Sequence, residues 1–103
     1  MTYDLVITDP AESDMIDIGL YVAQTLGSPI ASQNLLNELD NHILSLEVMP
    51  KRYPLVLNSR LARLGIRSIP VKNYLIFYTV DDDAQSVVII RVLYGKRDWA
   101  SLI

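Results

Sequence analysis

The sequence predicts an α+β domain in which a helical hairpin packs on one face of a mostly antiparallel β-sheet. Two segments with apolar residues at helical spacing follow one another near residues 10–26 and 29–47. A strand-like segment precedes them, and three more follow, separated by turn residues. The resulting order, β-α-α-β-β-β, is typical of helices gathered on one side of a sheet. A chain of 103 residues, of which 50% are apolar, fits a single domain spanning residues 1–103.

The first helix is expected to have Asp9 as its N-terminal cap. An aspartate can accept hydrogen bonds from the free backbone N–H groups of a helix start, and Pro10 suits the first helical position. Gly27 marks the expected end of this helix. Its apolar face consists of Met15, Ile18, Val22 and Leu26.

The second helix repeats this arrangement, since Ser28-Pro29 again places a capping residue before a proline. Pro50 lies beyond its expected end. The short connection between the two helices favours an antiparallel hairpin. The apolar face of the second helix consists of Leu35, Leu39, Ile43 and Leu46.

The strands are predicted from alternation and from β-branched and aromatic content. Pro70 lacks a backbone N–H, which indicates an irregular strand or an edge position for its strand. The intervening segment from Lys51 to Leu64 has no clear period and is expected to be a loop that could contain one helical turn. The predicted strands are Tyr3–Thr8, Ile66–Val71, Tyr74–Val80 and Ser86–Tyr94, with a turn at Asp81–Ala84 and a tail from Lys96 to Ile103.

Charge is divided unevenly along the chain. Residues 1–50 contain eight acidic residues and no Lys or Arg, whereas residues 51–103 contain nine basic and four acidic residues. Such asymmetry indicates a polyanionic partner for the basic half, although the basic residues could equally scatter over a solvated surface. The chain has no cysteine, which excludes disulfides and thiolate chemistry and fits a reducing cytoplasm. No apolar run is long enough to span a membrane, and no basic N-terminal segment indicates a secretory signal.

Two segments carry a resemblance to a known family. Residues 65–78, GIRSIPVKNYLIFY, resemble one strand pair of the RelE/ParE toxins, and residues 88–98, VIIRVLYGKRD, are similar to the closing strand of that family. The resemblance implies the toxin of a bacterial type II toxin–antitoxin, or plasmid stabilisation, module. It further implies a cognate antitoxin bound in a hetero-oligomer, no cofactor and no metal.

The family divides by target. RelE-like members are metal-free endoribonucleases that cut mRNA on the ribosome, whereas ParE-like members poison DNA gyrase. Here Leu75 stands where many ribonucleases carry an arginine, Tyr94 stands where a histidine is frequent, and no tyrosine-bearing extension follows Ile103. The resemblance therefore favours the ParE-like branch, with the ribonuclease as the alternative.

The candidate target-binding residues are basic, because a guanidinium or ammonium group suits a phosphate or carboxylate. Arg67 could instead form a cross-strand salt bridge, and Arg97 could anchor the tail. If the protein is a ribonuclease, the expected catalytic residues are Arg67, Lys72, Tyr94 and Arg97. The full set of expected target-binding residues is Arg67, Lys72, Arg91, Arg97, Lys51 and Arg52.

Other conspicuous residues have simpler explanations. Tyr94 is more readily explained as a half-buried strand tyrosine than as an acid or base. The single histidine, His42, has no catalytic partners and is expected to be packed or exposed on its helix. The aspartates 81–83 suit a hairpin turn better than a cation site. Four aromatic residues could offer a platform for stacked bases but are expected mostly in the core: Tyr53, Tyr74, Phe77 and Tyr78.

Overall fold

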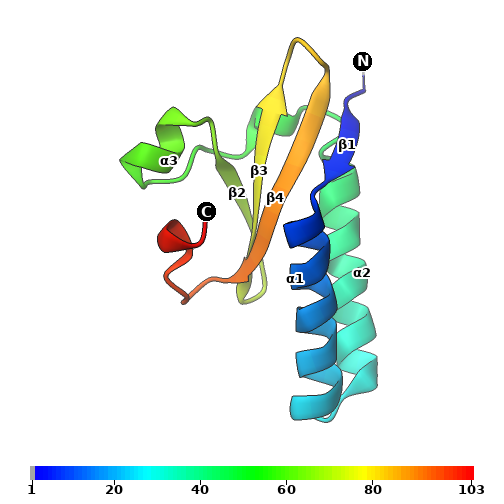
Figure 1. The fold of residues 1–103 in the computed structure, drawn as a ribbon. Helices are drawn as coiled ribbons and strands as arrows, with labels where there is room; N and C mark the ends of the chain where they lie inside the picture. The colour runs from blue at the N-terminus through cyan, green and yellow to red at the C-terminus, as the bar shows by residue number, and fades with distance from the viewer. Residues whose placement is uncertain (1) are drawn as a thin grey trace.

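In the computed structural model, which describes residues 2–103, four strands form one mixed sheet with a helical hairpin on one face (Figure 1). The sheet order is β1-β4-β3-β2, in which β1 runs parallel to β4 and the other pairs are antiparallel. The predicted fold class is therefore confirmed. No helix among the described residues is long and apolar enough to cross a membrane. The strands are β1 (Asp4–Ile7), β2 (Arg67–Val71), β3 (Tyr74–Asp81) and β4 (Ser86–Tyr94).

The first helix is α1 (Asp9–Leu20), and it continues into the π-helical turn η1 (Tyr21–Thr25). The prediction that Asp9 caps this helix is wrong, because Thr8 does so. The Thr8 hydroxyl accepts a hydrogen bond from the Ala11 N–H at 3.3 Å, and the Thr8 N–H donates to the Ile89 carbonyl at 3.2 Å. Thr8 thus completes the pairing of β1 with β4, so the helix begins immediately after it.

The second helix, α2 (Pro29–Ser45), begins as predicted and ends two residues earlier than predicted. The Ser28 hydroxyl accepts from the Ala31 N–H at 3.2 Å. Across the hairpin, the buried Ser32 hydroxyl donates to the Gly19 carbonyl at 2.7 Å. A methyl group at Gly19 would lie 3.0 Å from a Leu36 methyl group, so the absence of a side chain allows the two helices to approach this closely.

Both faces of the sheet are covered. Residues alternate along β3, so that the fully buried Tyr78 faces the helices and the fully buried Phe77 faces the other side. The expectation that these aromatic residues belong to the core is confirmed. Most of the helix-side core consists of apolar residues of α1, α2 and the strands. The smaller core on the opposite face contains Val56, Leu61, Ile66, Phe77 and Leu93.

The segment between α2 and β2 is more structured than predicted. It contains the 3₁₀ turn η2 (Pro50–Arg52) and the short helix α3 (Ser59–Arg63), which Asn58 caps by accepting from the Leu61 N–H at 3.1 Å. The tail forms another 3₁₀ turn, η3 (Trp99–Ser101), and returns over the second face near α3 (Figure 1). There the Trp99 ring lies 5.1 Å from the Phe77 ring, centroid to centroid.

Candidate functional site: a tyrosine pocket and the basic residues around it

Arg67, the first of the predicted target-binding residues, holds a loop in place. Its guanidinium donates to the Tyr53 carbonyl at 2.6 Å and to the Lys51 carbonyl at 3.3 Å. These bonds attach the segment after α2 to the start of β2. Arg67 therefore forms neither a free anion contact nor the cross-strand salt bridge considered as its alternative.

Lys51 and Arg52 have similar structural roles. Lys51 forms an ion pair with Asp82 in the turn between β3 and β4. Hydrogen bonds from Lys51 and then from Tyr3 lower the pKa of Asp82. Arg52 closes the C-terminal end of α2, where it donates to the Val48 carbonyl at 2.8 Å. The Lys51 ammonium group thus already pairs with the turn formed by aspartates 81–83. No cluster of possible metal ligands occurs among residues 2–103.

Arg91 is bound by Asp14, a residue that the sequence interpretation missed. Its guanidinium makes two hydrogen bonds to the Asp14 carboxylate, at 2.7 and 2.9 Å, and these bonds raise the pKa of Arg91. Asp14 also accepts from the Val92 N–H at 3.0 Å, and Arg91 donates to the Leu102 carbonyl at 3.1 Å. One signal was present in the sequence, since Asp14 lies four residues before Ile18 and therefore on the face of the helix that was predicted to be apolar.

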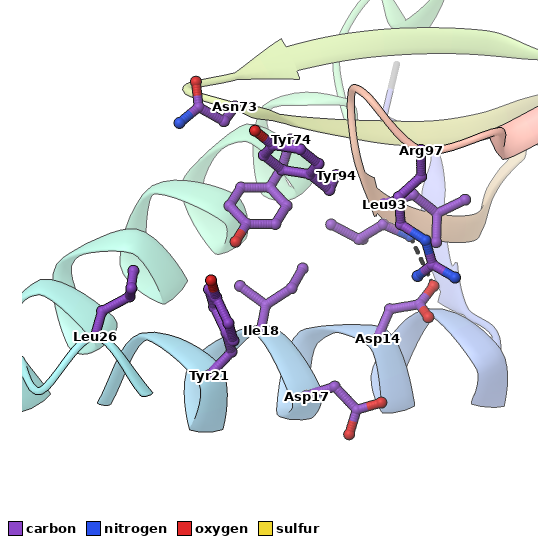
Figure 2. A pocket seen from close by; sticks show the side chains of 11 residues that line it. Asp14, Asp17, Ile18, Tyr21, Leu26, Asn73, Tyr74, Leu93, Tyr94 and Arg97 are labelled. Atoms are coloured by element: carbon purple, nitrogen blue, oxygen red, sulfur yellow. Dashed lines mark hydrogen bonds between the residues drawn. The ribbon is translucent and has the colours of Figure 1, made fainter. Parts of the chain in front are cut away.

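A pocket of about 500 Å³ opens between the helix α1 and the ends of β3 and β4 (Figure 2). Tyr74 and Tyr94 are cross-strand partners whose rings meet edge to face, with 5.8 Å between their centroids. Tyr21, at the start of the π-helical turn, lies across the pocket from them. Burial, followed by the neighbouring Tyr21 and Tyr94, raises the pKa of the Tyr74 hydroxyl. We refer to this site as the tyrosine pocket.

The tyrosine pocket also contains polar side chains that have no partner among the described residues. Among residues 2–103, the side chains of Asp17, Asn73 and Arg97 form no hydrogen bond or ion pair within the chain. Two of the predicted site residues, Tyr94 and Arg97, therefore meet here, together with Tyr21 and Asp17, which the sequence interpretation did not single out. Figure 2 shows Asp17 on the helix and Arg97 on the segment after β4.

The four residues expected for a ribonuclease do not form one cluster. Arg67 begins β2, whereas Lys72 lies in the turn beyond the end of that strand, roughly 16 Å further along an extended chain. The Lys72 Nζ atom lies 3.8 Å from the Glu38 carboxylate, and both side chains are exposed. Tyr94 and Arg97 lie near the Lys72 end of β2. Arg67 thus lies at one end of β2, and the other three residues of the alternative catalytic set lie near its opposite end.

The helical hairpin over a four-stranded sheet in the order β1-β4-β3-β2 is the fold of the RelE/ParE toxin superfamily. Residues 5–99 match the family model of the ParE toxin of the type II toxin–antitoxin system, parDE. The chain therefore belongs to the ParE toxin family. No curated protein matches the sequence significantly.

Solved structures with the same fold are distant in sequence. A chain of the chromosomal ParDE system from P. aeruginosa superposes with a TM-score of 0.75 at 13% identity, covering 92% of this chain and 98% of that one. A mutant of E. coli toxin RelE in the free state superposes with a TM-score of 0.71 at 15% identity, covering 99% of this chain and 93% of that one. A chain of the toxin–antitoxin complex RelBE2 from Mycobacterium tuberculosis superposes with a TM-score of 0.67 at 21% identity, covering 91% of this chain and 99% of that one.

Proposed function

We propose that this protein is the toxin of a type II toxin–antitoxin module and inhibits growth by binding DNA gyrase. Membership of the ParE toxin family over residues 5–99 supports the module. One structural observation favours binding over RNA cleavage: the residues of the alternative catalytic set are separated, and Arg67 already donates to two backbone carbonyls. A metal-free ribonuclease needs its acid, base and charge-stabilising groups around one reacting phosphate.

An antitoxin is the proposed partner. Two of the structural relatives, from M. tuberculosis and E. coli, are toxin–antitoxin complexes. Half of this chain is strongly acidic and half is basic, so an antitoxin with a complementary charge pattern could cover it. We expect a hetero-oligomer in the cytoplasm in which the antitoxin folds onto the toxin and blocks the target.

The test is controlled expression of the gene with and without the adjacent reading frame. The toxin alone should arrest growth, and DNA supercoiling should be disturbed before protein synthesis falls. Co-expression of the adjacent frame should restore growth and yield a complex that co-purifies. If the neighbour neither restores growth nor binds, the module assignment fails.

Tyr94→Phe separates binding from cleavage, because it keeps the ring and removes only the hydroxyl. The variant should remain nearly as toxic as the wild type, since the proposal gives this hydroxyl no chemistry. Loss of one general acid or base in a ribonuclease costs about 10²–10⁴-fold in rate. Position-specific cuts within translated mRNA that disappear in Tyr94→Phe would favour the ribonuclease instead.

A further inference from the structure

We infer that the tyrosine pocket receives a large apolar side chain of the antitoxin, flanked by an acidic residue that pairs with Arg97 and a basic residue that pairs with Asp17. The identity of the partner rests on the proposed function. The chemistry of the partner segment rests on the pocket itself: its exposed rings, its unusual helical turn and two charges that no residue of 2–103 pairs with.

The rings give the pocket an exposed apolar lining. Tyr21 is 50% exposed, Tyr94 is 37% exposed and Leu26 is 60% exposed, and all three line the same hollow. Grouped apolar side chains of this kind mark binding sites on single chains. Tyrosine is enriched at protein interfaces because its ring buries well and its hydroxyl can stay hydrated. A lining this open suits a side chain on a partner segment, which can also cover the rim, better than a small molecule.

The helical turn that bears Tyr21 departs from α-helical geometry at this site. The Leu26 N–H donates to the Tyr21 carbonyl at 3.1 Å, a bond across five residues. Tyr21 begins that turn and Leu26 follows it directly, and both line the pocket. Single π-helical turns are rare and are frequently found at functional sites. The π-helical turn at the pocket is therefore a second observation, independent of the exposed rings.

The charges specify what should surround the apolar side chain. Arg91 neutralises Asp14, the deeper carboxylate of the pocket, through a paired hydrogen bond. Asp17 and Arg97 form no such pair among residues 2–103, so the pocket presents one open carboxylate and one open guanidinium. A partner that covered the Asp17 carboxylate or the Arg97 guanidinium without an opposite charge would remove water from that group and offer no attraction in return. An acidic residue facing Arg97 can form two parallel hydrogen bonds with the guanidinium.

The experiment measures the affinity of the purified antitoxin, encoded by the adjacent frame, for the toxin and its variants. Tyr21→Ala removes one wall of the pocket and should weaken binding about 30-fold or more, the loss typical of an interface anchor. Asp17→Lys and Arg97→Glu should each weaken binding about tenfold or more. Reversing the charge of the antitoxin residue opposite Arg97 should restore the binding of Arg97→Glu. Thermal unfolding of each variant establishes that it is folded.

Matched controls make the same kinds of change elsewhere: one truncates an exposed large side chain, and two reverse an exposed charge. Leu57→Ala and Arg63→Glu lie near α3, and Asp83→Lys lies in the turn at the opposite end of β3; all three positions are exposed. These controls should bind within about threefold of the wild type. If wild-type toxin does not bind the antitoxin, the proposed function and this inference both fail. If it binds and the three pocket variants bind equally well, only the inference fails. Pocket variants that lose toxicity but keep antitoxin binding would assign the pocket to the target and overturn the inference.

Discussion

The ion pair between Asp14 and Arg91 joins the first helix to the last strand and to the tail. Their side chains are only 12% and 22% exposed, and both Asp14 oxygens accept hydrogen bonds from Arg91. Asp14→Asn removes the negative charge and should lower the free energy of unfolding by about 2–3 kcal/mol, below the usual cost of breaking a fully buried pair because water partly screens this one. Urea unfolding measures the loss.

Asp17→Asn is the matched control for that prediction. Asp17 lies on the same helix and is exposed, so its substitution should change stability by less than about 0.5 kcal/mol. Equal losses for the two variants would mean that the pairing of Asp14 with Arg91 contributes nothing specific to stability.

Ionisation of Tyr78 should lower the free energy of unfolding at alkaline pH. Burial raises its pKa from 10.0 to about 12, and its hydroxyl donates to the Pro50 carbonyl at 2.6 Å. Between pH 10 and 12, the hydroxyl would ionise in the unfolded chain but stay protonated in the folded one. The stabilisation is therefore complete below pH 10 and is lost as the pH rises towards 12, by about 2–3 kcal/mol.

Tyr78→Phe tests this assignment. It should cost about 1 kcal/mol at neutral pH, because the Pro50 carbonyl loses its partner. It should also reduce the decline in unfolding free energy between pH 10 and 12, measured by urea titration at each pH. A decline as steep as in the wild type would attribute the alkaline sensitivity to other residues.

The site residues show what sequence patterns reveal and what they leave out. Arg97 and Tyr94 were identified as candidates, and the structure places both at the tyrosine pocket. Arg67 was also a candidate, but its hydrogen bonds to the loop carbonyls depend on how residues 51–53 fold back onto β2. Tyr21 was not singled out, because its contribution arises from tertiary approach of the helix to β3 and β4.

At the scale of the elements, a buried hydrogen bond joins α1 to α2 in the helical hairpin. The Ser32 hydroxyl donates to the Gly19 carbonyl at 2.7 Å, and Ser32 is 7% exposed. Ser32→Ala should lower stability by about 1–2 kcal/mol, since the alanine cannot replace this bond in the interior. Ser13→Ala, at an exposed position of α1, is the matched control and should be nearly neutral. A neutral Ser32→Ala would show that water or relaxation replaces the bond.

Most elements were predictable because local signals agreed with the tertiary structure. Ser28-Pro29 began α2 as expected, and β4 has the predicted bounds, Ser86–Tyr94. Pro70 does lie in an edge strand, where its missing N–H costs no sheet hydrogen bond. The cap at Thr8 was mispredicted because β1 needs that residue to complete its pairing with β4, a long-range requirement that a local cap rule does not contain.

For the molecule as a whole, the charge asymmetry of the sequence has a partly structural explanation. Six of the nine basic side chains contact carboxylates or backbone carbonyls of the chain, which holds the loop after α2, the hairpin turn and the tail against the sheet. The segment between α2 and β2 and the tail also cover the second face of the sheet. Fewer basic groups are therefore free for a target than the sequence suggested. The six residues are Lys51, Arg52, Arg60, Arg67, Lys72 and Arg91.

We propose that the protein poisons gyrase by binding it, without chemistry of its own. The most direct measurement is DNA supercoiling by purified gyrase as a function of toxin concentration. Wild-type protein and Tyr94→Phe should inhibit supercoiling at similar concentrations, and the antitoxin should reverse the inhibition. Supercoiling that is unaffected at a large excess of toxin would contradict gyrase as the target.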